Sequence, residues 1–495
     1  MKPICLVIPP SVFLLDERVF MSLGILRVAA VLEQAGHTVE VLDLSGIENY
    51  EDVTRQHAAS STAEFFGITA TTPQMPAAAK VAAAIRATRQ DARLILGGPY
   101  ITLVNAALKG ERRAGRHGRA ERAFQRAAEL FDILVAGDGE EAIFKALAPG
   151  APNFIDADDP SSPMFLDDKR LNHLPWPARH LVDVESYHYT IEGEQAMSMI
   201  AQLGCPFECG FCGGRESPML RRVRMRSEEN IVAEMTHLTK TWGAKGIMLY
   251  DDELNVNPRV VHLMEAIAAE QKKLGIQWKL RGFIKSQLFT DQQAAAMYAA
   301  GFRWILVGFE SGSPRILQNI NKHATLEENN RCMEIARRNG LKTKALMSIG
   351  HPGENEQTIR ETKQWLLDVK PEDFDVALIT TYPGSPYYDW ALPVEGKEGI
   401  SVYTYPKTGD RLYGIEVDYT KVADYFKGDP DGGYRAYVYT DHLTSERLVE
   451  LRDEVERDVR KALNIPFNHS TAAVRYEHSM GITQLPPRIL RTTKK

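Results

Sequence analysis

Short apolar segments alternate with amphipathic helical segments along the N-terminal third of the chain. Apolar runs typical of buried parallel strands fall at residues 4–9, 38–42, 65–69, 94–96 and 133–136. Helical spacing of apolar residues is found between them, at residues 22–34 and 77–89. Because strands that alternate with helices form a parallel sheet covered on both faces, this pattern predicts a Rossmann-like, flavodoxin-like α/β domain.

The predicted strands end in small or polar residues. These ends are Pro-Pro-Ser at 9–11, Thr-Ala-Thr-Thr at 69–72, Gly-Gly-Pro at 97–99 and Gly-Asp-Gly at 137–139. Ligands of parallel sheets bind beyond the carboxyl ends of the strands, so this edge predicts a surface for a large flat ligand. No G-x-G-x-x-G motif follows the first strand, which argues against a nicotinamide or flavin dinucleotide.

A second series of strands and helices follows. Strands are predicted at residues 197–203, 246–250, 277–281, 304–307, 343–349 and 376–381, and the clearest helix between them is 228–242. These six units predict a second parallel βα series, with any catalytic groups at the carboxyl ends of the strands.

We therefore expect four parts. They are an α/β domain (residues 1–147), a Pro-, Asp- and Ser-rich linker (148–190), the second series of strands and helices (191–386) and a C-terminal α+β region (387–495). Eleven of the 18 tyrosines fall within residues 382–439, a composition that packs the open side of a barrel or covers a cavity mouth. An amphipathic helix is predicted at 444–463.

Composition and charge narrow the functional classes. With 59 Lys and Arg against 65 Asp and Glu, the net charge of −6 argues against a nucleic-acid protein. No apolar run approaches the roughly 20 residues of a membrane span, and the N-terminus has no signal-peptide profile, which predicts a cytoplasmic protein. Two basic runs, at 109–122 and 221–226, are typical of solvated faces, with an acidic partner or a charged ligand as the alternatives.

The strongest chemical signal is a loop with three cysteines. Cys205, Cys209 and Cys212 are spaced C-x-x-x-C-x-x-C within Gly-Cys-Pro-Phe-Glu-Cys-Gly-Phe-Cys-Gly-Gly. Three thiolates on one loop can ligate three irons of a four-iron cluster and leave the fourth iron open. Structural zinc takes four ligands, and Cys5 and Cys332 are distant in sequence, so a zinc site is the less favoured alternative.

This loop and the strand ends behind it resemble the radical S-adenosylmethionine (SAM) superfamily over residues 197–386. The resemblance implies that the six βα units form the open partial (βα)6 TIM barrel of that family. The resemblance implies catalytic roles for the three cysteines, which hold a 4Fe-4S cluster whose open iron chelates SAM. Reductive cleavage of SAM then gives a 5′-deoxyadenosyl radical that abstracts hydrogen. An external electron donor of the flavodoxin or ferredoxin type is also implied.

The same resemblance implies SAM contacts at several strand ends. The residues that match the family's motifs are Phe211 and Ile349 beside the adenine, Asp251 and Asp252 at the amino group, and Glu310 with Ser311 at the ribose. Arg281, at the end of its predicted strand, is the candidate for the SAM carboxylate. Taken singly, each of these residues is equally typical of a cap, a turn or a surface ion pair.

The N-terminal strand ends resemble those of a cobalamin-binding domain. The matching segments are Ser-Leu-Gly-Ile-Leu at 22–26, Gly-His at 36–37, Leu-Gly-Gly-Pro-Tyr at 96–100 and Gly-Asp-Gly-Glu-Glu at 137–141. The D-x-H-x-x-G signature is absent, so no histidine is expected below the cobalt, and a degenerate domain without cobalamin is the alternative. The contacts implied are Ser11, Leu23, Gly24, Thr69, Thr71, Gly97, Gly98, Pro99, Gly137 and Glu140.

Together these features resemble the cobalamin-dependent radical SAM enzymes. That class most often methylates an unactivated carbon of a small metabolite or natural-product intermediate, through a 5′-deoxyadenosyl radical and methylcobalamin. One alternative is cyclisation, ring rearrangement or oxidation without methyl transfer. Another is a non-catalytic sensor of cobalamin or of the cluster, which the SAM-contact residues disfavour because a sensor has no need of them.

Overall fold

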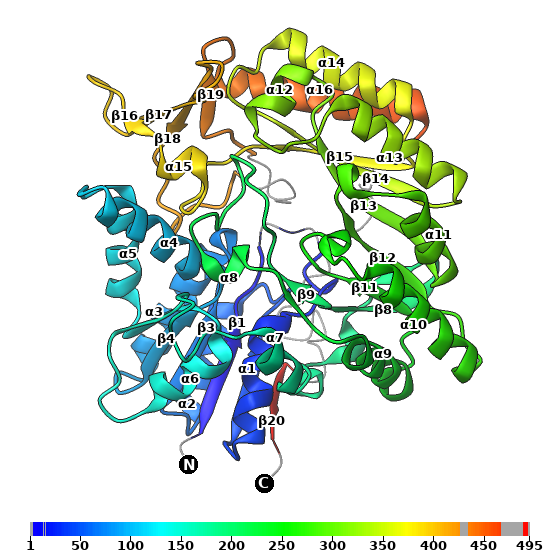
Figure 1. Ribbon diagram of the computed structural model, residues 1–495. Coiled ribbons are helices and arrows are strands. Elements are labelled where there is room, and N and C mark those ends of the chain that lie inside the picture. Colours follow the sequence, from blue (N-terminus) through cyan, green and yellow to red (C-terminus); the bar gives the residue numbers. More distant parts are fainter. Residues whose placement is uncertain (1–2, 13, 15, 426–433, 467–488, 494–495) are drawn as a thin grey trace.

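Two open sheets lie side by side in the computed structural model, with the cysteine loop between them (Figure 1). The structure describes residues 3–12, 14, 16–425, 434–466 and 489–493. None of the helices in these ranges is long and apolar enough to cross a lipid bilayer.

The N-terminal sheet has seven strands in the order β20-β2-β1-β3-β4-β5-β6. All of them are parallel except β20, which pairs antiparallel with β2. The order β2-β1-β3-β4-β5 is the flavodoxin-like order, which confirms the predicted fold class. The strands are β1 (Ile4–Ile8), β2 (Val39–Asp43), β3 (Phe65–Thr69), β4 (Arg93–Gly97), β5 (Ile133–Gly137), β6 (Phe154–Ala157) and β20 (Leu490–Thr492).

Six helices cover the two faces of this sheet. They are α1 (Leu23–Gln34), α2 (Tyr50–Ser60), α3 (Met75–Thr88), α4 (Pro99–Arg113), α5 (Arg119–Leu130) and α6 (Gly139–Leu147). Apolar residues on alternate sides of the central strands fall into two separate core clusters, one on each face. The short strands are buried almost throughout, as expected for a parallel sheet between helical layers.

The predicted linker contributes strands to both sheets. Residues 154–157 form β6, which pairs with β5, and β7 (Thr190–Ile191) lies at the edge of the second sheet. β6 was not predicted from the sequence, because the segment 148–177 is polar and only Ile155 and Ala157 of the strand are fully buried. Three-residue 3-10 turns and α7 (Asp168–His173) complete the connection.

The second sheet is the predicted partial barrel, in the order β15-β14-β13-β12-β11-β8-β7. Six parallel strands confirm the (βα)6 prediction: β8 (Glu194–Met199), β11 (Gly246–Leu249), β12 (Lys279–Ile284), β13 (Phe302–Glu310), β14 (Lys342–Ile349) and β15 (Asp373–Leu378). The helices that follow its strands are α9 (Glu228–Trp242), α10 (Val260–Leu274), α11 (Asp291–Ala299), α12 (Pro314–Asn319), α13 (Leu326–Arg338) and α14 (Glu356–Val369).

Segments of the C-terminal region pack against different parts of the protein. A four-stranded antiparallel sheet, β16 (Leu392–Pro393), β17 (Ile400–Thr404), β18 (Arg411–Ile415) and β19 (Val438–Thr440), follows the short helix α15 (Pro386–Asp389). Helix α16 (Ser445–Leu463) packs on α14 and β15, while β20 returns to the N-terminal sheet. Within the predicted part 387–495, residues 426–433, 467–488 and 494–495 lie outside the described ranges.

A buried ion pair joins the end of β5 in the first sheet to β10, and a second buried pair lies beside it. Arg224, in β10 (Arg224–Met225), lies 2.7 Å from the carboxylate of Asp138 at the end of β5, and both side chains are almost fully buried. Arg226 pairs with Glu234 of α9 at 2.6 Å. The prediction that residues 221–226 form a solvated face is therefore wrong for these two arginines, which are buried in ion pairs.

Candidate functional site

The cysteine loop is held by backbone hydrogen bonds to three other segments. It runs from β9 (Gln202–Leu203) to α8 (Pro218–Arg221). The N–H of Cys205 donates to the carbonyl of Leu220 at 3.0 Å, and the N–H of Gly210 donates to Ile320 at 2.8 Å. An added Cβ on Gly210 would lie 2.4 Å from the ring of Tyr387, so this position has no room for a side chain.

The three thiols lie close enough to influence one another. Burial raises the pKa of Cys205 to about 11 and also raises that of Cys209. Burial raises the pKa of Cys212 too, and the two other cysteines add to it electrostatically. The thiols are therefore protonated at neutral pH unless a metal displaces their protons.

The surroundings of the loop fit a cluster with one open iron. Cys332 is buried in the core around α13, and Cys5 lies in the other sheet, so neither supplies a fourth thiolate. A closed four-cysteine zinc site is not formed by the described residues. Three converging thiols are the donor set expected for three irons of a 4Fe-4S cluster.

Two buried lysines and two partly buried glutamates lie around Cys209, three of them at or after the ends of strands β11, β12 and β13 and the fourth, Lys322, between α12 and α13. They are Glu253, Lys285, Glu310 and Lys322, each of which acts electrostatically on the Cys209 thiol. Lys322 Nζ lies 2.9 Å from Glu310 Oε1, and although burial opposes it, this ammonium lowers the pKa of Glu310. Burial raises the pKa of Glu253 to about 7, and its Oε2 has no protein partner.

A chain of hydrogen bonds orients Glu310 from its other side. Ser348 Oγ donates to Glu310 Oε2 at 2.8 Å, His351 Nε2 lies 2.8 Å from Ser348, and His351 Nδ1 lies 3.2 Å from the Tyr387 hydroxyl. Burial lowers the pKa of His351 to about 3, so its ring is neutral. One proton arrangement satisfies every contact: Tyr387 donates to Nδ1, Nε2–H donates to Ser348, and Ser348 donates to Glu310.

The predicted SAM residues divide by position. Phe211 faces the site, with its ring 5.5 Å from that of His351. Asp251 is buried behind it, where Oδ1 accepts from the N–H groups of Ala201 and Gln202 at 2.7 and 2.6 Å and burial raises its pKa to about 7. This carboxyl group therefore fixes the segment that leads into the cysteine loop, whereas Asp252 retains an exposed side chain.

Two further predicted contacts point into the protein. The Ser311 hydroxyl lies 3.0 Å from that of Thr362 on α14, and this pair shapes the turn after β13. The Ile349 side chain is buried in the core. Any contact that Ile349 makes with a ligand would therefore use its backbone.

Arg281 does not end its strand, which corrects the prediction. β12 continues to Ile284, and Arg281 lies inside the barrel, 5.6 Å from the Trp304 ring centroid. Lys285 is the first residue beyond the strand, held by Asn255, and its Nζ lies 3.6 Å from the Phe207 ring centroid in the cysteine loop. A strand predicted to end three residues later would have identified Lys285 as a site residue. No pattern in the sequence distinguishes Lys322.

The strand ends of the N-terminal sheet line a cavity of about 330 Å³. Nine of the ten predicted cobalamin residues line it: Leu23, Gly24, Thr69, Thr71, Gly97, Gly98, Pro99, Gly137 and Glu140. Ser11 does not, although its hydroxyl accepts a hydrogen bond at 3.0 Å from Gln74, which does. None of the described lining residues is a histidine.

The glycines of this cavity serve two different purposes. An added Cβ on Gly24 would meet nothing within 4 Å, and one on Gly97 would meet only the Val135 carbonyl oxygen at 4.0 Å, which leaves room for a ligand. Gly98 and Gly137 have φ of +93° and +92°, and a Cβ there would lie 2.5 Å from Thr69 and 2.3 Å from the backbone of Asp158. The latter two glycines are thus required by the protein's own close packing.

The far wall of the cavity comes from the barrel side. Ile200, Leu203, Met219 and Leu220 line it, and Leu203 and Leu220 flank the cysteine loop. One continuous space therefore extends from the strand ends of the first sheet to the segments that flank the cysteine loop.

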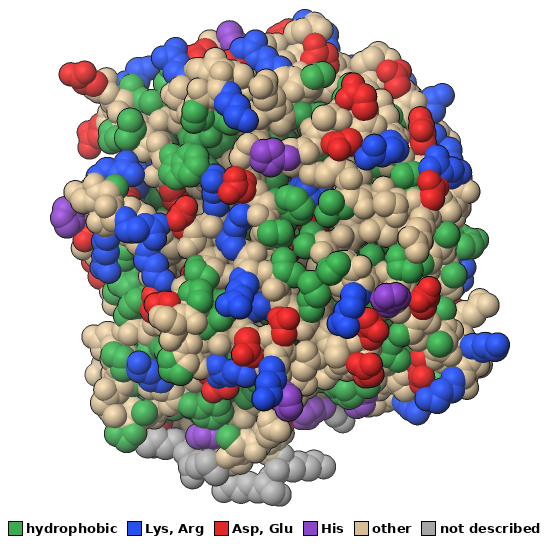
Figure 2. All heavy atoms as spheres, in the orientation of Figure 1, with side chains coloured by type: hydrophobic (Ala, Val, Ile, Leu, Met, Phe, Trp, Pro, Cys, Tyr) green, Lys and Arg blue, Asp and Glu red, His purple; other side chains and the backbone are tan. Residues whose placement is uncertain are grey.

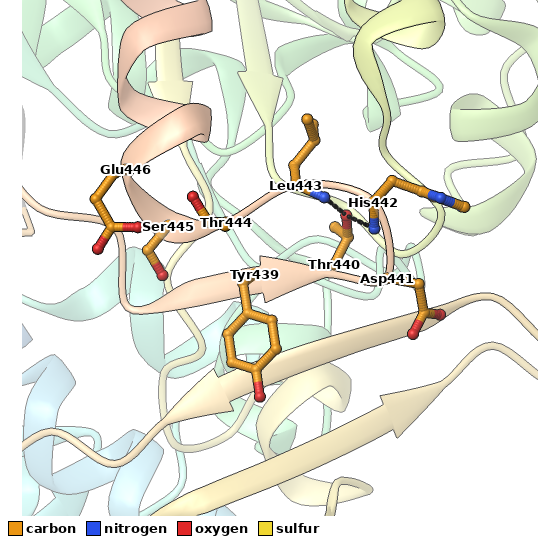
Figure 3. Close-up of a pocket in the computed structure, with 8 residues that line it drawn as sticks. All are labelled: Tyr439, Thr440, Asp441, His442, Leu443, Thr444, Ser445 and Glu446. Carbon is orange, nitrogen blue, oxygen red and sulfur yellow. Dashed lines mark hydrogen bonds between the residues drawn. The ribbon is translucent and has the colours of Figure 1, made fainter.

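Two other recesses lie away from the cysteines. Lys and Arg side chains gather over α4 and α5 (Figure 2), beside a cleft of about 710 Å³ against β16 and β17, but Arg122 is already paired with Glu416 there. The other recess surrounds the turn between β19 and α16, where Thr440 Oγ1 accepts from two backbone N–H groups (Figure 3). Neither recess brings reactive groups together.

Comparisons with known proteins match both halves of the chain. The radical SAM superfamily model matches residues 199–366, and the B12 binding domain model matches residues 17–128. An uncharacterized methyltransferase of Pyrococcus horikoshii is 26% identical over 79% of this chain and 83% of its own length. An anaerobic magnesium-protoporphyrin IX monomethyl ester cyclase of Rubrivivax gelatinosus is 23% identical, over 72% of this chain and 64% of its own.

Among solved structures, the chain is similar to the radical S-adenosylmethionine methyltransferase TsrM from Kitasatospora setae, with cobalamin and a [4Fe-4S] cluster bound. The TM-score is 0.63 at 18% identity, over 93% of this chain and all of that one. This likeness shows that the two proteins share a fold.

Proposed function

The chain belongs to the radical SAM enzymes that carry a cobalamin-binding domain, and on that premise we propose that it methylates an unactivated carbon of a small-molecule substrate. Its cofactors are a 4Fe-4S cluster, SAM and cobalamin. When bound, the cluster with SAM supplies a 5′-deoxyadenosyl radical, and cobalamin supplies the methyl group.

The shared cavity is the observation that carries this proposal. Its walls combine the glycine-lined strand ends of the first sheet with Leu203 and Leu220, at the two ends of the cysteine loop. A methyl donor in front of the first sheet and a radical source on the loop would thus face one space. Chemistry on one carbon needs both reagents within contact distance of it.

The residues around the cysteines suit the parts of SAM. We assign the unpaired carboxyl oxygen of Glu253 to the amino group, and Lys285 to the carboxylate, where it is better placed than Arg281. Glu310, ionised by Lys322 and oriented through Ser348, has lone pairs left for the ribose hydroxyls. Phe211 and the neutral ring of His351 offer apolar surface to the adenine.

The reaction also needs an electron from outside the chain. We assign that role to a flavodoxin- or ferredoxin-type donor, since three cysteines support one cluster and the described residues hold no second cysteine group.

The test is to incubate the reconstituted enzyme with cobalamin, a strong reductant and SAM, and to quantify two products. Methyl transfer from SAM leaves S-adenosylhomocysteine, whereas reductive cleavage leaves 5′-deoxyadenosine. We expect both products from the wild type. The Cys205→Ala/Cys209→Ala/Cys212→Ala variant should form no 5′-deoxyadenosine, because it has no cluster.

Cys332→Ala is the matched control, because this buried cysteine lies outside the loop, and it should form both products. 5′-Deoxyadenosine alone, from wild type shown to be loaded with cobalamin, would contradict methylation. It would favour cyclisation, rearrangement or oxidation without methyl transfer.

A further inference from the structure

A second group of metal-ligand side chains lies in the N-terminal sheet, away from the cysteine loop. Cys5 of β1 and Glu40 of β2 are cross-strand partners, so both side chains leave the sheet on the same face. His57, on α2, covers that face. Cys5 is near the amino end of β1, whereas the cavity lies at the carboxyl ends of the strands.

The three ligand atoms converge on one point. His57 Nε2 lies 3.3 Å from Cys5 Sγ and 3.2 Å from Glu40 Oε2, and all three atoms are within 4.8 Å of one another. Within the described part of the chain, no other group of three such residues meets this distance.

A single hydrogen on the His57 ring nitrogen cannot serve both of its contacts. Nε2 carries at most one hydrogen, so it can donate to Glu40 or accept from the Cys5 thiol, but not both. If it accepts from the thiol, its lone pair also faces the Glu40 carboxylate. A cation at the centre satisfies all three atoms at once.

We propose that Cys5, Glu40 and His57 bind one zinc ion. Bond lengths of about 2.3 Å to sulfur and roughly 2.1 Å to nitrogen and oxygen, at tetrahedral angles, separate ligand atoms by about 3.4 to 3.6 Å. The separations of 3.3 and 3.2 Å around His57 are within a few tenths of an ångström of that requirement. A mixed sulfur, nitrogen and oxygen set suits zinc, which is borderline in softness.

Burial keeps the site away from any substrate. Cys5 is fully buried, which excludes attack by its thiol on a substrate. Ser61 Oγ donates to Glu40 Oε2 at 2.8 Å and orients the carboxylate, as outer partners of metal ligands commonly do. The Glu40 side, where 13% of the side chain is exposed, admits a water molecule as the fourth ligand. The ion ties β1 and β2 to α2.

The test measures zinc and iron in the Cys205→Ala/Cys209→Ala/Cys212→Ala variant, which removes the iron–sulfur site. We expect about one zinc per chain in this background and near-complete loss when Cys5→Val or His57→Gln is added. Cys332→Val, which removes another buried thiol, is the control and should retain the zinc. Loss of zinc with Cys332→Val as well would overturn the proposal, because the metal would then report only on folding.

Cobalt(II) added to the same background provides a second measurement that does not depend on zinc content. Ligation by Cys5 should give a sulfur-to-cobalt charge-transfer absorption, absent with Cys5→Val and weakened with Glu40→Gln. Should Cys5→Val fail to fold, Glu40→Gln, which keeps the shape of a partly exposed side chain, decides the question by its zinc content. No zinc in the starting background, or iron in its place, would overturn the proposal and leave a His57–Glu40 ion pair.

Discussion

Lys322 illustrates how one buried charge sets the state of a site residue. Its ammonium and the Glu310 carboxylate are both nearly inaccessible, at 4% and 12% side-chain exposure. Glu310 is ionised because the attraction of Lys322 outweighs the cost of burial. Removing one member of such a pair leaves an uncompensated charge, which costs about 3 to 5 kcal/mol.

We predict that Lys322→Met destabilises the protein more at high pH than at low pH. In the wild type the lowered pKa of Glu310 contributes stability that is present above its unfolded pKa and is lost as the pH falls through the folded one. In the variant, burial outweighs the remaining hydrogen bond from Ser348 and raises this pKa, so stability falls as the pH rises through it. Thermal unfolding midpoints, compared anaerobically at pH 5.5 and pH 8, measure the difference.

Lys342→Met is the control for that comparison. Lys342 also pairs with a glutamate, Glu192, at 3.0 Å, but 46% of its side chain is exposed. Its loss should change stability by less than about 1 kcal/mol at either pH. Equal shifts for the two variants would contradict a special role for burial.

Helix α1 permits a test of the cobalamin site at the scale of an element. Gly24 lies in this helix and lines the cavity, and an added Cβ meets nothing within 4 Å. Gly24→Leu should therefore fold normally, since leucine favours a helix over glycine by about 1 kcal/mol, but should fill ligand space. We expect it to lose retention of hydroxocobalamin through gel filtration.

Gly110→Leu in α4 is the matched variant. Gly110 is also a helical glycine with open space around an added Cβ, yet it lies outside the cavity. It should retain cobalamin like the wild type. Undiminished retention by Gly24→Leu would place the corrin elsewhere.

At the scale of the whole molecule, Arg224 joins the first sheet to β10. It pairs with Asp138 and also donates to the carbonyls of Leu166 and Met219. Arg224→Met should cost about 3 to 5 kcal/mol, because Asp138 is left buried without its cation. Since Asp138 also lines the cavity, the variant should lower both the thermal midpoint and cobalamin retention.

Arg122→Met is the control for the loss of an ion pair between distant parts of the chain that is not buried. Arg122 joins α5 to Glu416 of the C-terminal region, but 48% of its side chain is exposed. We expect a change of less than about 1 kcal/mol and normal cobalamin retention. A comparable loss in both variants would show that burial at Arg224 is not decisive.

The sequence by itself determined the elements and the chemistry that depends on local order. Parallel strands buried on both faces are continuous apolar runs, which is why most strands were predicted within a few residues. The three cysteines lie within eight residues, so their spacing alone indicates a cluster. Gly24 and Gly97 were also predicted from local sequence to line a ligand site, because the strand ends and helix starts of a parallel sheet meet at one edge.

The tertiary structure decided what depends on contacts between distant segments. β12 ends three residues later than its apolar pattern predicts. This difference in length decides that Lys285, and not Arg281, lies beside the cysteines. Arg224, in a basic run typical of a solvated face, is buried because Asp138 meets it across the interface. Lys322 and the group formed by Cys5, Glu40 and His57 have no local signature, because their partners approach only when separate strands and helices pack together.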